Sequence, residues 1–158
     1  MPVRERREFL QDVKNIVDSN NLADVDVIGS SLRLDFSVKE DANYIMSGAL
    51  TVSGRRLVRR AEHQAKEFEK NSSVYHEMFF GNAGEPARIR IRFKLNSDVV
   101  CVTNADLLDV FNGSKYLVGL GGEYIYRGDS TAIVQAYFRF GGDGCLIEVG
   151  LSQGFMGR

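Results

Sequence analysis

The stretch PARIRIRFKL, residues 86–95, alternates apolar and cationic side chains almost without interruption. Successive side chains of a β-strand point to opposite faces of its sheet. The apolar set is Ile89, Ile91, Phe93 and Leu95, and the cationic set is Arg88, Arg90, Arg92 and Lys94. The pattern predicts a strand whose apolar face lies in the core and whose cationic face points away from it. What neutralises this row of cations is the main functional question that the sequence raises.

Length and composition are those of an ordinary globular domain. The chain has 158 residues, of which 44% are hydrophobic and 26% are charged, which is enough to bury one core without added cross-links. We therefore expect a single domain over 1–158. Its formal net charge is only −1, so any attraction to a polyanion has to come from a local patch.

Three helices are predicted from apolar spacing and from capping residues. Apolar side chains recur at helical spacing over 4–19, which predicts an amphipathic N-terminal helix. The segment 54–70 has a similar apolar stripe with Ser53 as a candidate N-cap, so a second helix is predicted there. A short capped helix is expected over 104–113.

The remaining segments are typical of strands and turns. Alternation predicts a strand over 31–39, and the turn residues after it favour a return strand over 44–52, where the apolar spacing also fits a helix. The segment 71–85 is interpreted as a loop or a short turn. The cationic strand is expected to form a hairpin with 98–103. A second hairpin is expected over 131–154, with Gly142-Asp143 at its turn and Phe138 opposite Ile147. The predicted fold class is therefore α+β: a mainly antiparallel sheet with the N-terminal helix and the helix near 54–70 packed on one face.

A second group of cations stands in the predicted helix. It consists of Arg55, Arg56, Arg59 and Arg60. Like charges four residues apart destabilise a helix by about 0.2–0.5 kcal/mol per pair, and cations near its N-terminus oppose the helix dipole. A helix that bears both unfavourable terms suggests that negative charge outside the helix compensates its arginines. We predict one anion-binding surface made of Arg55, Arg56, Arg59, Arg60, Arg88, Arg90, Arg92 and Lys94.

The counter-charge has two possible sources. Carboxylates of the chain itself can fold over the arginines, and the candidates are Asp35, Glu40, Asp41, Glu62 and Glu85. Alternatively, the cations face nucleic-acid phosphates or an acidic protein surface. Aromatic side chains available for stacking would then be Tyr44, Tyr75, Phe80 and Tyr137. The leading hypothesis is a non-catalytic binding or assembly protein that docks on a polyanion or an acidic protein partner.

Signals for catalysis are weak. No thiol or carboxylate lies at a local spacing that would make His63 or His76 a metal ligand or a member of a catalytic triad. The glycine-rich run GLGGEY, residues 119–124, lacks the Lys-Ser/Thr pair of a phosphate loop. We expect no cofactor and no metal. A small enzyme with an anionic substrate is kept as one alternative.

Another alternative is a self-assembling structural subunit. Such a homo-oligomer would pair through sheet edges and through the C-terminal hairpin. The tail LSQGFMGR, residues 151–158, contains apolar residues on a short segment. We therefore predict that the tail packs against another chain or into a groove of its own sheet.

The cysteines and the N-terminus bear on location. Cys101 and Cys145 lie in apolar alternating stretches and are interpreted as buried thiols rather than as a disulfide. The first residues are highly charged and lack the apolar run of a secretion signal. No apolar run approaches the roughly 20 residues of a membrane span. We therefore expect a cytoplasmic protein with no membrane partner.

Overall fold

The structure is a computed structural model, and it describes residues 2–46, 52–81, 86–121 and 123–154. Its helices are α1 (Arg6–Ser19), α2 (Val25–Leu32) and α3 (Asn104–Val110). Its strands are β1 (Leu34–Met46), β2 (Val52–Gln64), β3 (Tyr75–Phe80), β4 (Pro86–Lys94), β5 (Leu117–Leu120), β6 (Glu123–Arg127), β7 (Val134–Phe140) and β8 (Leu146–Gln153).

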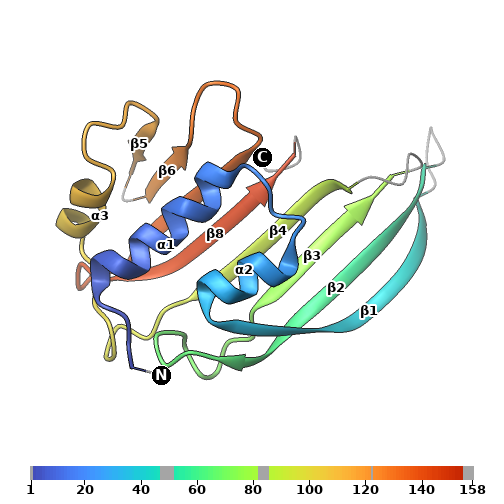
Figure 1. Cartoon of the computed structure of the whole chain (residues 1–158), viewed down its shortest axis with the longest axis horizontal. Helices are drawn as coiled ribbons and strands as arrows, with labels where there is room; N and C mark the ends of the chain where they lie inside the picture. Colours follow the sequence, from blue (N-terminus) through green and yellow to red (C-terminus); the bar gives the residue numbers. More distant parts are fainter. Residues whose placement is uncertain (1, 47–51, 82–85, 122, 155–158) are drawn as a thin grey trace.

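The strands form one eight-stranded sheet in the order β1-β2-β3-β4-β8-β7-β6-β5, and every neighbouring pair is antiparallel. The helices α1 and α2 lie across one face of this sheet, and α3 packs beside α1 (Figure 1). None of the described helices covers the opposite face, which we call the open face. The predicted α+β class with a mainly antiparallel sheet is confirmed.

Helix α1 forms for the reason that the sequence indicated. Its buried side chains follow the helical period and are Phe9, Leu10, Val13, Ile16 and Val17. Helix α2 was not predicted. Its N-cap Asp24 accepts a hydrogen bond from the Val27 amide at 3.2 Å, and such a cap stabilises a helix by about 1 kcal/mol. Because α2 continues to Leu32, the strand predicted from residue 31 begins only at Leu34.

The predicted helix over 54–70 is wrong. Most of this segment is strand β2, which pairs with β1 on one side and with β3 on the other. Leu57 and Ala61 are four residues apart, a spacing that places them on one face of a strand as well as on one face of a helix. Ser53 is accordingly a strand residue and not an N-cap. The pairing with two neighbouring strands overrides the local helical pattern.

Strand β4 has the predicted orientation. Ile89, Ile91 and Phe93 are fully or almost fully buried on the helix-covered face, whereas Arg92 is exposed. The predicted hairpin between β4 and 98–103 is wrong, because β4 lies between β3 and β8. The segment 71–85, interpreted as a loop, contains strand β3.

Cys101 and Cys145 form a disulfide with an S–S distance of 2.01 Å. The interpretation of these cysteines as thiols is therefore wrong. The bond joins the loop before α3 to the residue before β8, which are distant in sequence by 44 residues. A cross-link over so long a loop constrains the unfolded chain strongly.

The C-terminal hairpin β7–β8 is confirmed, but with a different register from the one that the turn suggested. Phe138 pairs with Val149 and not with Ile147, a difference of two residues, of which the bulge between Arg139 and Phe140 contributes one. A shift by two keeps each side chain on its predicted face. Phe138 and Val149 are accordingly both buried in the core.

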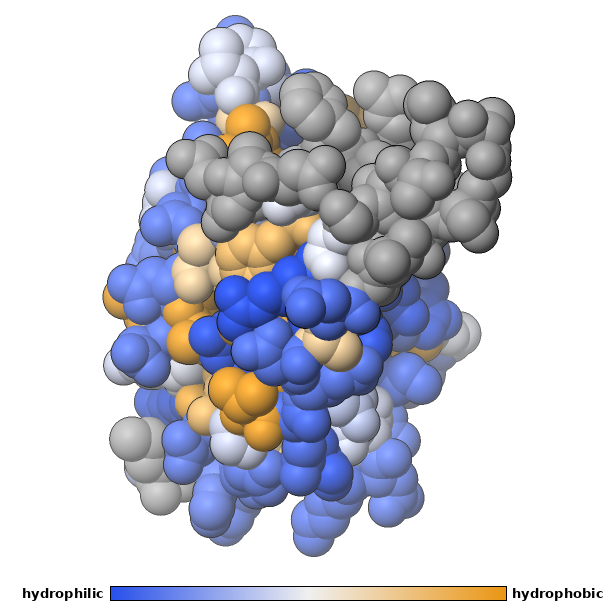
Figure 2. Space-filling model, turned by 90° about the vertical axis from the view of Figure 1, so that its right-hand side faces the viewer, coloured by the Kyte–Doolittle hydropathy of each residue, from blue (hydrophilic) through white to orange (hydrophobic). Residues whose placement is uncertain are grey.

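The surface agrees with a chain that buries most of its large apolar side chains. Seen from the right-hand side of Figure 1, hydrophilic residues dominate, and hydrophobic residues form small separate groups (Figure 2). None of the described helices combines the length and the apolar character needed to cross a membrane.

Candidate anion-binding site on the open face

The two cationic segments lie on neighbouring parts of the sheet, but not all of their arginines share a face. Arg55 and Arg59 alternate with Arg56 and Arg60 along β2, so the two pairs point to opposite faces. The first pair shares the helix-covered face with buried Leu57. The open face carries Arg56, Arg60, Arg88, Arg90, Arg92 and Lys94. Six of the eight predicted cations therefore lie together.

The helix costs that suggested an external counter-charge do not apply to these arginines, because they stand in a strand. In a strand, neither the i,i+4 repulsion across a helical turn nor the helix dipole acts on Arg55 to Arg60. Arg55 is instead paired on its own side of the sheet. It donates to both carboxylate oxygens of Asp41, at 2.6 and 2.8 Å, and these bonds lower the pKa of Asp41. Arg55 thus has an internal partner.

Glu77 neutralises part of the open face. Its Oε2 accepts from Arg56 at 3.3 Å and from Arg90 at 3.2 Å. Arg56 also contacts Glu40 at 3.1 Å. All three arginine contacts involve partly exposed groups, so each stabilises the fold by at most about 1 kcal/mol. Of the predicted carboxylates, Glu40 pairs with Arg56 and Asp41 with Arg55, whereas Glu77 was not among those predicted.

A second carboxylate, Glu148 of β8, is only 8% exposed. It accepts from the Tyr137 hydroxyl at 2.5 Å and from Arg139 at 3.2 Å, and Arg92 lies 4.0 Å away. Burial alone would raise the pKa of Glu148, but the hydrogen bonds from Tyr137 and Arg139 outweigh it and lower that pKa. Burial and the same carboxylate raise the pKa of Tyr137 to about 12. Glu148 therefore stays ionised and Tyr137 protonated at neutral pH.

Two rows of three residues cross β2, β3 and β4 on the open face. One row is Arg60–Tyr75–Arg92 and the other is Arg56–Phe79–Arg88, each with its members directly opposite one another. In both rows an aromatic residue stands between two arginines. Glu77 lies on β3 between the two rows. The sequence analysis named Tyr75 but missed Phe79 and Glu77, although alternation in YHEMFF carried the signal.

In the second row, Arg56–Phe79–Arg88, the aromatic ring is contacted by the arginines on both sides, and we call it the closed row. The guanidinium carbon of Arg56 lies 5.8 Å from the centre of the Phe79 ring, and that of Arg88 lies 5.6 Å from it. Both distances are within the range of cation–π attraction. Phe79 therefore holds its two arginines in place, and its ring is not free to receive a flat ligand.

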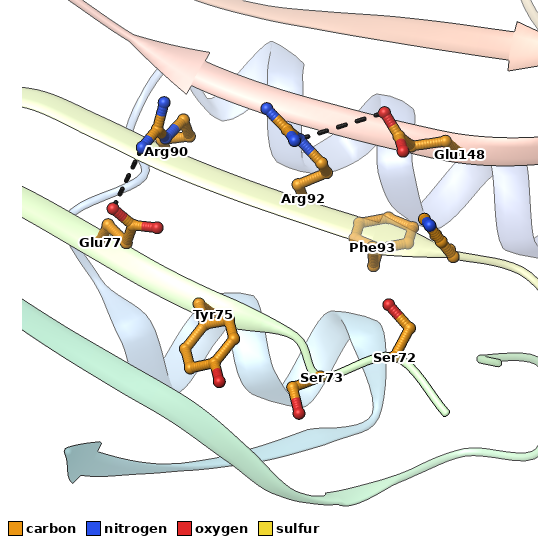
Figure 3. A pocket seen from close by; sticks show the side chains of 9 residues that line it. Ser72, Ser73, Tyr75, Glu77, Arg90, Arg92, Phe93 and Glu148 are labelled. Atoms are coloured by element: carbon orange, nitrogen blue, oxygen red, sulfur yellow. Dashed lines mark hydrogen bonds and ion pairs between the residues drawn. The ribbon is translucent and has the colours of Figure 1, made fainter. Parts of the chain in front are cut away.

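The open face is hollowed on both sides of Tyr75. A hollow of about 500 Å³ is lined by Ser72, Ser73, Tyr75, Glu77, Arg90, Arg92, Phe93, Lys94 and Glu148. A second hollow, of about 350 Å³, is lined by Lys39, Glu40, Arg56, Val58, Arg60, Tyr75 and Glu77. Tyr75 and Glu77 line both, so together they form the ridge between the hollows. Figure 3 shows the first hollow with the β3–β4 ion pair above Tyr75.

Part of the positive charge on this face has no carboxylate within reach. Among the described residues, Arg60 and Lys94 make no ion pair, and the Nε atoms of Arg60 and Arg88 are buried without a hydrogen-bond partner. A buried N–H without a partner costs about 1–3 kcal/mol. An external anion cannot reach these buried Nε atoms, but the absence of an ion pair at Arg60 and Lys94 leaves their charge available to one.

The other candidate residues lie elsewhere. His76 is fully buried on the helix-covered face and contacts Leu22, so no ligand reaches it. His63 is exposed, and its Nδ1 lies 3.7 Å from Asp35. Phe80 packs against the core. The side chain of Tyr44 and the end of the tail, 155–158, lie outside what the structure describes.

Metal chemistry has no visible basis in the described part of the chain, where no three His, Cys, Asp or Glu side chains gather as a metal site would require. No family model, curated protein or solved structure matches the chain.

Proposed function

We propose that this is a non-catalytic binding protein that docks onto nucleic-acid phosphates through the open face of its sheet. The supporting observation is the gathering of six cations from β2 and β4 on a face that no described helix covers. Arginine guanidinium groups bind phosphate oxygens in a planar, two-pronged way. Only part of this charge is matched by Glu40, Glu77 and Glu148.

The aromatic residues favour nucleic acid over an acidic protein as the partner. Protein partners are held mainly by buried apolar anchors at the centre of an interface, and the open face has polar hollows around Tyr75 instead. Nucleic-acid binding by a sheet combines a cationic groove with exposed rings on which bases stack. Tyr75, at 39% exposure, offers such a ring beside Arg92.

The test is a titration of a fluorescent 20-nucleotide single strand at several salt concentrations. The parent should bind with an affinity that falls with salt, at a log–log slope near −0.7 per phosphate contact. Arg56→Gln/Arg60→Gln and Arg90→Gln/Arg92→Gln should each weaken binding and flatten the slope. Arg55→Gln/Arg59→Gln is the matched control, because these arginines lie on the opposite face. A parent that binds no oligonucleotide would refute the proposal.

Self-assembly through sheet edges is supported less well. The edge strands of the sheet are β1 and β5. β1 carries the exposed charged residues Lys39, Glu40 and Asp41, and β5 has only four residues. Charged or very short edges are the usual means by which sheets resist edge-to-edge pairing. A monomeric mass in sedimentation would agree with this reading.

The location proposed from the sequence is cytoplasmic, and one observation weighs against it. The disulfide between Cys101 and Cys145 joins two segments of the same domain. Structural disulfides persist mainly in oxidising compartments and are rare in a reducing cytoplasm. Thiol labelling of the protein purified under non-reducing conditions decides this point, because a cytoplasmic protein should expose both thiols after denaturation.

A further inference from the structure

The two arginine–aromatic rows of the open face differ in how their rings are occupied. Phe79 has a guanidinium on each side, within 6 Å of its ring centre. Tyr75 stands in the same position between Arg60 and Arg92, yet among the described residues no cation covers its ring and nothing accepts from its hydroxyl. Its exposed fraction is 39%. The Tyr75 row therefore has the same arrangement as the Phe79 row, but no cation among the described residues contacts its ring.

Cations stand on both sides of Tyr75. Lys39, Arg56 and Arg60 line the hollow toward β1 and β2. Arg90, Arg92 and Lys94 line the hollow toward β4, together with the hydroxyl groups of Ser72 and Ser73. Since neighbouring strands are about 4.8 Å apart, the backbones of Arg60 and Arg92 are separated by about 10 Å. Each hollow thus provides its own set of groups that can donate hydrogen bonds to a phosphate.

Glu77 explains why the two hollows do not act as one. Its carboxylate lies on the ridge beside Tyr75 and is bound by Arg56 and Arg90. A single phosphate placed over the ridge would be repelled by this carboxylate. Two phosphates, one on each side, avoid Glu77 and still reach Arg60 and Arg92.

From this arrangement we infer that the Tyr75 site binds single-stranded nucleic acid, with one base stacked on the Tyr75 ring and the two flanking phosphates in the two hollows. The inference rests on the proposed function and specifies its ligand. A base inside a duplex is stacked on both faces by its neighbours, so a tyrosine ring cannot stack on it. A base in a single strand can expose one face to the ring. Arg60, which lines the hollow toward β1 and β2 and makes no ion pair among the described residues, belongs to one phosphate subsite. Arg92, 4.0 Å from its nearest carboxylate, belongs to the other.

The experiment compares three substitutions by fluorescence anisotropy with a labelled 12-nucleotide oligothymidylate. Tyr75→Leu removes the ring and should weaken binding by about 5- to 150-fold, the usual contribution of one stacked base. Tyr75→Phe keeps the ring and should bind within about 2-fold of the parent. Phe79→Leu is the matched control in the closed row, and it should have the smaller effect. Circular dichroism melting establishes that each variant is folded.

Salt dependence separates stacking from phosphate contact. Tyr75→Leu should leave the log–log salt slope unchanged, because no phosphate contact is lost. Arg60→Gln and Arg92→Gln should each reduce the slope by about 0.7, and the double variant by about twice that amount. A duplex of the same sequence should bind the parent more weakly than the single strand.

The outcomes distinguish this inference from the proposed function. Arginine variants that bind weakly beside a Tyr75→Leu variant that binds like the parent would leave the proposed function standing and overturn the stacking site. Equal binding of duplex and single strand would overturn it as well. A parent that binds polyglutamate as tightly as the oligonucleotide, or that binds neither, would overturn both.

Discussion

His76 Nε2 lies 2.8 Å from the main-chain carbonyl oxygen of Leu22, and the histidine is fully buried. Its Nδ1 has no partner among the described residues. Burial, the largest effect, lowers the pKa of His76 below its ordinary 6.5; the hydrogen bond with the Leu22 carbonyl opposes it, and the charge of Arg59 lowers the pKa by a smaller amount. The folded protein therefore holds this imidazole neutral, as the donor to Leu22.

This contact predicts that stability falls in mild acid. Below pH 6.5 the unfolded chain binds a proton at His76 that the folded chain does not, so the free energy of unfolding decreases by up to about 1.4 kcal/mol per pH unit. Above pH 7 the same term is constant. Urea unfolding between pH 5.0 and 7.5 measures the slope. His76→Gln should remove it, whereas His63→Gln, at the exposed histidine, should retain it. An equal slope in His76→Gln would assign the effect to another group.

Phe93→Ala should destabilise the protein by about 3–5 kcal/mol. The Phe93 ring contacts those of Phe9 and Phe68 edge to face, at centroid distances of 6.1 and 5.3 Å. Truncation leaves a cavity between α1 and the sheet that these rings cannot fill. Chemical denaturation gives the value, and Arg92→Ala, one residue away on the open face, should cost less than about 1 kcal/mol. A loss below 1 kcal/mol for Phe93→Ala would mean that this part of the core is loosely packed.

Reduction of the disulfide should destabilise the protein measurably. Its cysteines are 44 residues apart, and chain-entropy reasoning gives about 4 kcal/mol for closing a loop of that length. Denaturation midpoints with and without reductant measure the difference. The double variant Cys101→Ser/Cys145→Ser should have the denaturation midpoint of the reduced parent, and reductant should not change that midpoint. If reductant leaves the parent unchanged, the bond does not form in the purified protein.

Strand β4 could be predicted because one short segment contains both the apolar residues of its buried face and the cations of its exposed face. Ile91 and Phe93 needed a core and Arg90 and Arg92 needed solvent or counter-charge, and only a strand with one covered face satisfies both. The burial of Ile91 and Phe93 and the exposure of Arg92 agree with this. The class of fold followed from several such segments.

The sequence misassigned β2 because its local pattern fits two structures. Leu57 and Ala61 share a face in a helix and in a strand alike. The information that decides between them lies far away, in β1 and β3, whose backbones pair with the two edges of β2. Local propensity cannot report such partners. The split of the arginines between two faces, and with it the site around Tyr75, depends on that long-range pairing.

Gly150→Ala should destabilise the protein although a methyl group is small. The Tyr137 ring lies across Gly150, the residue opposite it on β8, and a Cβ there would collide with the ring. The ring cannot move away easily, because its hydroxyl is bound to Glu148. We expect a cost of about 1–3 kcal/mol, and a lower Tyr137 pKa as the ring leaves Glu148. Gly142→Ala is the control, since a Cβ at Gly142 meets no atom within 4 Å. Thermal melting gives the stabilities, and ultraviolet titration of tyrosine follows the pKa. An alanine at 150 that costs no more than the one at 142 would show that the Tyr137 ring has other room to occupy.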